Sequence, residues 1–161
     1  VNACKAKDSV LLTVNPLPII ILSNDTVVCK ESSVTLTASG GGQYLWEPTG
    51  NTTASITTIP LTTTTYIVNV TTVNLCFAAD SVKITVLDYP LADLGNDTTI
   101  CSDKNIELDV TNPAASYLWS TLATTSSIII SQAGTYSVEV TSNSCKTKDS
   151  VKINTEDCIM Q

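Results

Sequence analysis

The stretch Asn96-Asp97-Thr98-Thr99-Ile100-Cys101 repeats a pattern that the chain carries earlier as Asn24-Asp25-Thr26-Val27-Val28-Cys29. The two stretches are about 72 residues apart. Downstream of each, Tyr44-Leu45-Trp46 recurs as Tyr117-Leu118-Trp119. A period of this length predicts two copies of one small unit rather than one large domain.

A third, partial copy opens the chain. Residues Cys4 to Val10 align with Cys76 to Val82, so we expect residues 1–14 to be the last strand of an upstream repeat. The two full copies then occupy residues 15–88 and 89–156.

Within each copy, apolar residues alternate with polar ones and are bounded by Gly, Pro, Asn or Ser, which is typical of half-buried strands. No window is typical of an amphipathic helix, and several short strands in about 70 residues match sandwich spacing. The sequence therefore predicts an all-β fold of tandem immunoglobulin-like antiparallel β-sandwiches. In the second copy we expect strands near residues 91–94, 106–110, 117–119, 127–130, 135–140 and 150–153. The predicted core residues are Trp46, Trp119, Tyr66, Tyr136, Leu36 and Leu108, the two tyrosines opening a strand as a tyrosine-corner residue does.

The amino-acid composition and net charge limit the classes of partner that the protein can have. Hydrophobic residues make up 43% of the chain and charged residues only 14%, so Thr and Ser must cover much of the surface. The net charge of −7 with eight basic residues argues against nucleic acid as a partner, because phosphate binding needs clustered Lys or Arg. No apolar run approaches the roughly 20 residues of a membrane span, and no signal peptide opens the chain. We expect a removed signal peptide or an internal fragment.

The six cysteines form no CxxC pair and the chain has no histidine, which favours disulfides over zinc and places the protein outside the cytoplasm. Pairing within each repeat would join Cys29 with Cys76 and Cys101 with Cys145. However, Cys101 precedes Leu108 by seven residues while Cys145 follows Val138 by seven. At about 3.3 Å per residue these cysteines belong at opposite ends of one sandwich, beyond the roughly 7 Å Cα limit of a disulfide.

A ladder between successive repeats avoids this distance. It pairs Cys29 with Cys145 and Cys101 with Cys158, and leaves Cys4 and Cys76 for cysteines upstream. Such cross-links would stop neighbouring domains from swivelling. Both pairing schemes stay open at this point.

The ordered set of Asp-Thr-x-x-Cys, Tyr-Leu-Trp, a Thr-rich stretch, Thr-Tyr-x-Val and Asp-Ser-Val resembles the immunoglobulin-like and PKD-like repeats of Bacteroidota extracellular proteins. These include gliding and surface adhesins exported by type IX secretion. The resemblance implies that residues 157–161 are a linker toward a C-terminal sorting domain. It also implies O-glycosylation at an Asp-Ser/Thr tripeptide that occurs five times, with acceptors at Ser9, Thr26, Ser81, Thr98 and Ser150. The alternative interpretation is that each aspartate caps a turn.

Catalysis is not expected. Without histidine there is no base for a serine or cysteine nucleophile. Glu107, Asp109 and Glu139 alternate with apolar residues and should face solvent. Asn24-Asp25 and Asn96-Asp97 are weak calcium candidates without an Asp-x-Asp run, so no metal or other cofactor is predicted.

The sequence therefore predicts a non-catalytic stalk of a secreted cell-surface adhesin. Its partners would be neighbouring repeats, covalent glycans and a distal adhesion target. The alternative is a carbohydrate-binding β-sandwich module of a secreted enzyme, which should display a row of exposed aromatic residues.

Overall fold

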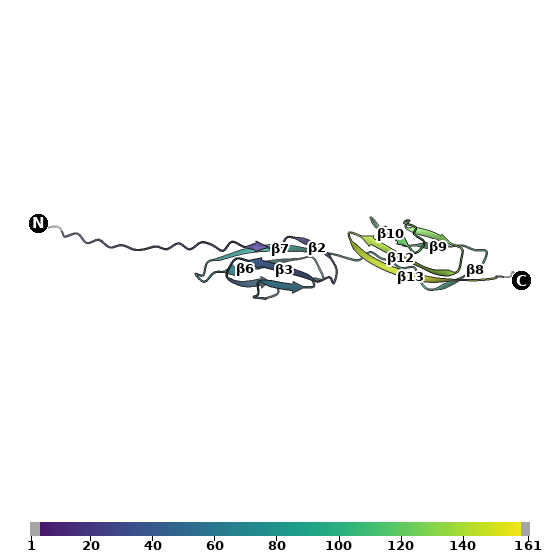
Figure 1. Cartoon of the computed structure of the whole chain (residues 1–161), viewed down its shortest axis with the longest axis horizontal. Helices are drawn as coiled ribbons and strands as arrows, with labels where there is room; N and C mark the ends of the chain where they lie inside the picture. Colours follow the sequence, from purple (N-terminus) through teal and green to yellow (C-terminus); the bar gives the residue numbers. More distant parts are fainter. Residues whose placement is uncertain (1–3, 159–161) are drawn as a thin grey trace. The chain divides into compact units, whose positions relative to one another are not determined.

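The computed structural model describes residues 4–158, which form thirteen strands, so the all-β prediction is confirmed. In this part of the chain no helix has the length and apolar character to cross a membrane. The first repeat contains β1 (Ile21–Leu22), β2 (Thr26–Cys29), β3 (Val34–Ser39), β4 (Gln43–Glu47), β5 (Ser55–Thr58), β6 (Thr64–Thr71) and β7 (Phe77–Leu87). The second contains β8 (Thr98–Cys101), β9 (Ile106–Asp109), β10 (Ser116–Trp119), β11 (Ser127–Ile130), β12 (Gly134–Ser142) and β13 (Cys145–Glu156), as Figure 1 shows.

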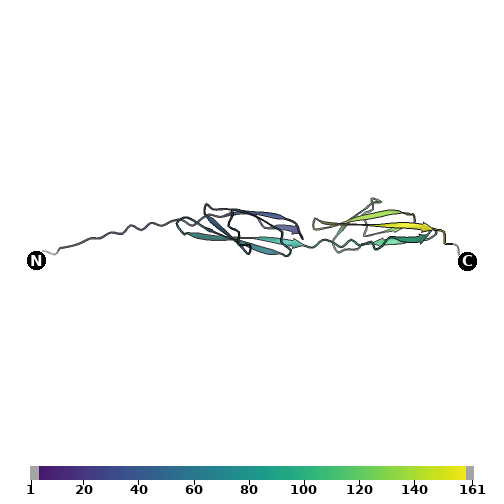
Figure 2. The same cartoon turned by 90° about the horizontal axis from the view of Figure 1, so that it is seen from below.

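Each repeat has one small and one large sheet. In the first repeat the orders are β1-β3-β5 and β2-β7-β6-β4, and in the second they are β11-β9 and β10-β12-β13-β8. No sheet of the described residues mixes strands from both repeats. Within each repeat the sheets form two layers (Figure 2).

The large sheets are mixed rather than purely antiparallel, which corrects the prediction in one detail. The short strand β2 pairs parallel with the last strand β7, and β8 pairs in the same way with β13. The pairings of β1 with β3, β10 with β12, β9 with β11, β12 with β13 and β4 with β6 are antiparallel. One of the two edges of each large sheet is therefore a short strand that ends in a cysteine.

The expected strand at residues 91–94 is wrong. These residues form no strand, because the backbone N–H and C=O of Leu91 bond to the side chain of Asn112 instead, at 3.1 and 2.7 Å. The Asn112 side chain thus makes the hydrogen bonds that a neighbouring strand would make. The chain still packs inward here, since Ala92 and Leu94 lie against the core of the second repeat.

The core of each repeat forms around one tryptophan. Trp46 and Trp119 are buried, and each indole Nε1 donates to a backbone carbonyl, of Thr53 at 2.9 Å and of Thr125 at 2.8 Å. These bonds satisfy the one polar group of the indole inside the core, as buried tryptophan requires. Around Trp119 the strands present every second residue inward. This cluster consists of Leu108, Val110, Ile130, Val138, Val140, Val151 and Ile153.

The predicted core residues differ in burial. Leu36, Leu108 and Tyr66 are buried, whereas Tyr136 is half-buried against the core. The Tyr136 hydroxyl donates to the carbonyl of Gln132 at 3.0 Å, four residues upstream, as in a tyrosine corner. The ring stays partly open because its hydroxyl reaches back to an exposed loop.

Contacts between residues divide the chain into two compact units that do not follow the repeats. One unit comprises the chain up to Asp25, Thr35–Thr58 and Thr65–Lys83, and the other comprises Thr26–Val34, Ile59–Thr64 and the chain from Ile84 onward. The boundaries expected at 15–88 and 89–156 stay a prediction.

The two chain ends carry the remaining predicted segments. Residues 4–20 form no strand and run as an extended trace from the N-terminus (Figure 1). A lone strand has no neighbour to pair with, so the assignment of residues 1–14 to an upstream repeat stays a prediction, with 1–3 outside the described residues. Of the expected linker at 157–161, residues 159–161 also lie outside them.

Candidate functional site: cysteines and repeated aspartates

One disulfide joins Cys29 to Cys145. Cys29 is the last residue of β2 and Cys145 is the first residue of β13, with a Cα–Cα distance of 5.7 Å and a sequence separation of 116. Cys145 is buried. Parallel pairing with β7 holds β2, and antiparallel pairing with β12 holds the start of β13, where Cys145 lies opposite Ser142.

The second disulfide joins Cys101 to Cys158, with a Cα–Cα distance of 5.3 Å and a sequence separation of 57. Cys101 ends β8 and lies opposite Glu156 in the parallel ladder. Two bonds hold the chain beyond this pair: the Ser102 N–H donates to the carbonyl of Glu156 and the Ser102 hydroxyl donates to Asp157, both at 2.8 Å. The tail that carries Cys158 is thereby fixed beside β8.

The structure thus brings together the cysteines of the ladder scheme. Among the described residues it contains neither bond of the within-repeat scheme, Cys29 with Cys76 or Cys101 with Cys145. Cys4 and Cys76 carry free thiols, Cys4 exposed and Cys76 half-buried. Cys29 and Cys101 occupy equivalent positions, yet only Cys101 finds its partner in the tail that follows its own repeat.

The aspartates before the short strands have a defined structural role. Asp25 accepts a hydrogen bond from the backbone N–H of Lys83 at 2.8 Å, and Asp97 accepts one from Lys152 at 2.9 Å. Each carboxylate therefore reaches across to the last strand of its repeat just where the parallel pairing begins. This fixes the register of the strand that ends in Cys29 or Cys101.

The other three aspartates of the tripeptides also bind backbone amides. Asp8 and Asp80 accept from the N–H of the serine that follows, both at 2.8 Å, and Asp149 accepts from Leu94 at 2.7 Å. The bonds of Asp8 and Asp80 are local, of the kind that the alternative interpretation of these tripeptides expects, whereas Asp149 bonds to an amide 55 residues away.

The hydroxyl groups of the five tripeptides differ in access. Ser9, Ser81 and Ser150 are exposed, whereas Thr26 and Thr98 are half-buried at the start of β2 and β8. The serine positions can therefore present a hydroxyl to a modifying enzyme more readily than the threonine positions.

The acidic residues that alternate with apolar ones differ in exposure. Within residues 4–158 no three His, Cys, Asp or Glu residues gather at metal-binding distance. Glu107 and Asp109 are exposed. Glu139 was also expected to face solvent, but its side chain is half-buried. It pairs with Lys146 at 2.6 Å and Lys148 at 3.0 Å, and the hydrogen bonds from these two lysines lower the pKa of its carboxyl. Glu139 is thus ionised at neutral pH and serves as an ion-pair partner.

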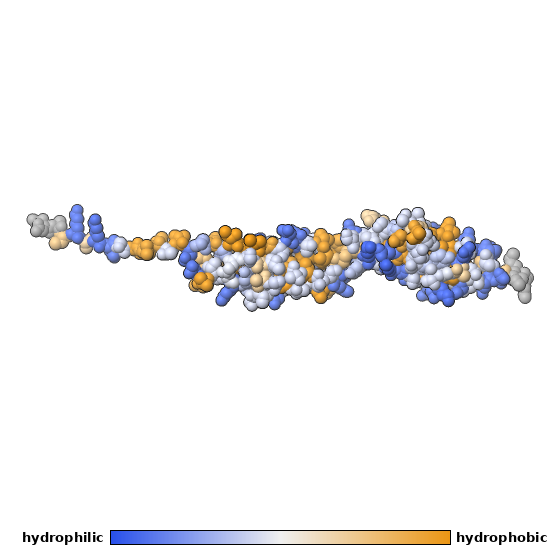
Figure 3. All heavy atoms as spheres, viewed as in Figure 1, coloured by the Kyte–Doolittle hydropathy of each residue, from blue (hydrophilic) through white to orange (hydrophobic). Residues whose placement is uncertain are grey.

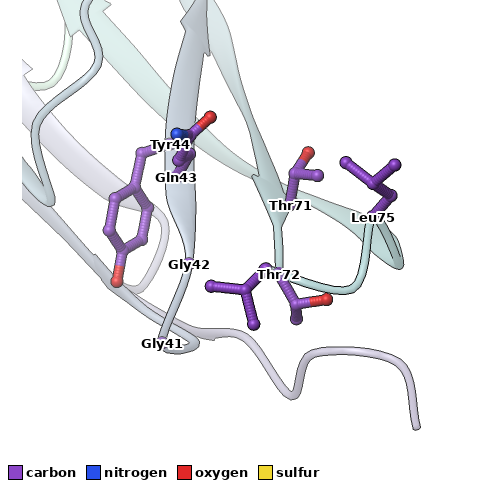
Figure 4. A pocket seen from close by; sticks show the side chains of 8 residues that line it. Gly41, Gly42, Gln43, Tyr44, Thr71, Thr72 and Leu75 are labelled. Atoms are coloured by element: carbon purple, nitrogen blue, oxygen red, sulfur yellow. The ribbon is translucent and has the colours of Figure 1, made fainter. Parts of the chain in front are cut away.

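Sequence reasoning missed the hairpin that follows β6. Its side chains Val73, Leu75 and Phe77 are exposed beside Cys76, and Leu75 and Val73 border a hollow of about 480 Å³. Figure 4 shows this hollow between the start of β4, at Gln43 and Tyr44, and the hairpin. A comparison of the two repeats could have found it, because the second repeat carries Ser142, Ser144 and Lys146 at the positions of Val73, Leu75 and Phe77.

Comparisons with known proteins bear on the fold. No protein-family model matches the chain, and no curated protein sequence matches it. An I-band fragment of titin matches 89% of this chain over 67% of its own, at 14% identity with a TM-score of 0.51. The insect immune protein hemolin matches 86% of this chain at 15% identity with a TM-score of 0.55, and 47% of its length is covered, so this chain spans about half of it. The immunoglobulin-like fold is thereby confirmed, and at such identities the likeness extends to the fold alone.

Proposed function

We propose that this chain is a pair of structural repeats from a secreted surface adhesin, where it holds a distal binding region away from the cell and performs no catalysis. The observation that carries the proposal is the Cys29–Cys145 disulfide, which links one repeat covalently to the next. A link of this kind restricts movement between repeats, which a spacer needs and a small-molecule site does not.

The disulfides support the proposed role in two ways, through the compartment in which they persist and through the stability that they add. Disulfides persist in oxidising compartments and are rare in the cytoplasm. In addition, closing a loop of about 100 residues stabilises a fold by roughly 4 to 5 kcal/mol in the chain-entropy treatment. A small domain with a limited hydrophobic core gains most from such a constraint.

We further propose that the parent protein belongs to the type IX-secreted adhesins of Bacteroidota and carries O-linked glycans. The ordered motifs described above support the first part. The exposed hydroxyls of Ser9, Ser81 and Ser150 support the second. Sugars there would add the hydration that a surface poor in charge lacks. Intact mass of the native protein tests this directly, since a mass equal to the bare polypeptide rejects glycosylation.

The rival function, a carbohydrate-binding module, has less support. Such a module needs a row of exposed aromatic rings, and among the described residues only Phe77 and Tyr89 are exposed aromatics. A glycan array separates the two functions, because specific binding by this chain alone favours the module.

A replacement experiment tests the spacer role. In the parent protein, residues 15–156 are exchanged for an unrelated pair of immunoglobulin-like domains of equal length, and the attachment of cells is measured. A spacer tolerates the exchange, while simple deletion of the segment reduces attachment. Loss of attachment after the exchange, with the protein still displayed, would show that these residues recognise a target themselves.

A further inference from the structure

Cys76 occupies the same position in the first repeat as Cys145 does in the second. Each lies four residues before the aspartate of an Asp-Ser-Val motif, at Asp80 and Asp149. Cys145 is buried and bonded to Cys29, which ends the short edge strand of the preceding repeat. Cys76 lies directly before the matching strand β7, is half-buried and carries a free thiol. The internal comparison therefore indicates what kind of partner Cys76 lacks.

The Cys76 sulfur lies 3.8 Å from the carbonyl oxygens of Asn15 and Asn74, and three apolar side chains next to it are exposed. Val73, Leu75 and Phe77 are 93%, 82% and 67% exposed. Exposed apolar side chains that form a contiguous patch mark interaction sites in soluble proteins. This hairpin surface, defined as Thr72–Phe77, lies beside the hollow in Figure 4.

A second observation concerns residues 8–14, which repeat the sequence of the last strand. Val10 and Leu12 correspond to Val82 and Ile84 of β7, which are completely buried. In this chain Val10 and Leu12 are instead 93% and 82% exposed. Apolar atoms accordingly cover much of the extended N-terminal segment in Figure 3. Side chains of this pattern fit the inner face of a sandwich, but in this chain they have no core to pack against.

From these two observations we infer that the hairpin surface is a covalent docking site for a preceding copy of the same repeat. Residues 4–14 form the last strand of that copy, and the cysteine at the end of its short edge strand bonds to Cys76. The inference rests on the proposed function and extends it, since it makes the Cys29–Cys145 link one member of a series.

The bond forms by thiol–disulfide exchange with an acceptor disulfide of the oxidising compartment. The Cys76 thiolate attacks one sulfur of the acceptor and displaces the other as a thiolate. The second cysteine then attacks the Cys76 sulfur in the mixed disulfide, which closes the new bond and releases the acceptor as a dithiol. Two protein thiols are oxidised, and the acceptor takes up their two electrons and two protons.

A fusion chain tests the inference. Residues 89–144 are placed directly before Cys4, so that Cys4–Val14 can complete the added copy in the place of Cys145–Thr155. After refolding with oxidised and reduced glutathione, we expect the added copy of Cys101 to be bonded to Cys76 in non-reducing peptide maps. We also expect backbone amides of residues 8–14 to exchange with solvent at least tenfold more slowly than in the original chain.

The controls distinguish the possible results. Cys4→Ser in the fusion should leave the new bond intact, whereas Cys76→Ser should remove it. A Cys76 that still reacts fully with iodoacetamide, or an added cysteine bonded to Cys4, would overturn the inference. Retention of Cys29–Cys145 in the same sample would leave the proposed spacer function standing.

A second variant applies if the fusion does not form its two original disulfides. Cys158→Ser in the original chain frees Cys101, which is equivalent to Cys29. We expect head-to-tail species linked through Cys76 and Cys101 of different molecules, and their loss in the Cys76→Ser background. Monomers alone, or links through Cys4, would refute docking at this hairpin.

Discussion

The interlaced disulfides predict how the chain extends when it is pulled from its two ends. With both bonds in place, force passes from Cys29 directly to Cys145 and then along 13 residues to Cys158. The Cys29–Cys145 bond hides 116 residue steps from the force. The Cys101–Cys158 bond hides nothing further, because the segment from Cys145 to Cys158 already provides a shorter route.

Removal of the first bond gives a defined change in length. In the double variant Cys29→Ser/Cys145→Ser, only the 57 steps between Cys101 and Cys158 stay hidden, so 116 − 57 = 59 steps are released. At about 3.4 Å per extended residue, the fully stretched chain becomes roughly 200 Å longer than the wild type. Full reduction of the wild type releases all 116 steps, or roughly 390 Å.

Optical-tweezers or atomic-force stretching of the single chain, attached at its termini, measures these lengths. The matched control is Cys101→Ser/Cys158→Ser, whose stretched length should equal that of the wild type. A control chain that is longer than the wild type would mean that the cysteines are not paired as Cys29–Cys145 and Cys101–Cys158. Either that result or an unchanged Cys29→Ser/Cys145→Ser chain would refute the reasoning.

Three further predictions concern stability. Trp119→Ala should lower the free energy of unfolding by about 3–5 kcal/mol, because it removes the largest side chain from the centre of a core. The control Leu118→Ala, on the exposed face, should change this free energy by under about 0.5 kcal/mol. Urea titration followed by circular dichroism measures both values. Asp97→Ala removes the bond to a β13 amide and should cost about 1 kcal/mol in the same assay, with the exposed Asp103→Ala as the neutral control. Glu139→Gln should flatten the acid side of the stability curve. The pKa of Glu139 is lowered in the fold, so its ion pairs contribute fully at neutral pH, and their contribution is lost as the pH falls below about 4.3 and through the lowered value. An identical acid limb in the variant would contradict this role.

Much of the fold could be predicted because the same pattern of strands occurs in both copies of the repeat. The alternation of apolar residues predicted β9 to β13 close to their observed positions, because every second residue of a half-buried strand is apolar. The position of tryptophan in β4 and β10 located the centre of each core. These features depend on local pattern, which a single chain displays in full.

The features that sequence reasoning missed depend on single long-range contacts. The strand expected at residues 91–94 is absent because one side chain, Asn112, takes its hydrogen bonds. The parallel edge strands could not be predicted from alternation, because four residues carry too little pattern. Glu139 was assigned to solvent from its place in the strand, and only the structure places two lysines around it.

The order of the bonded cysteines along the chain has a consequence for survival among proteases. The first cysteine pairs with the third and the second with the fourth, so the two covalent loops overlap. A single cut at any peptide bond between Cys29 and Cys158 therefore leaves every piece attached to the rest. A nicked molecule of this kind still connects its two ends until the disulfides are reduced or further cuts accumulate.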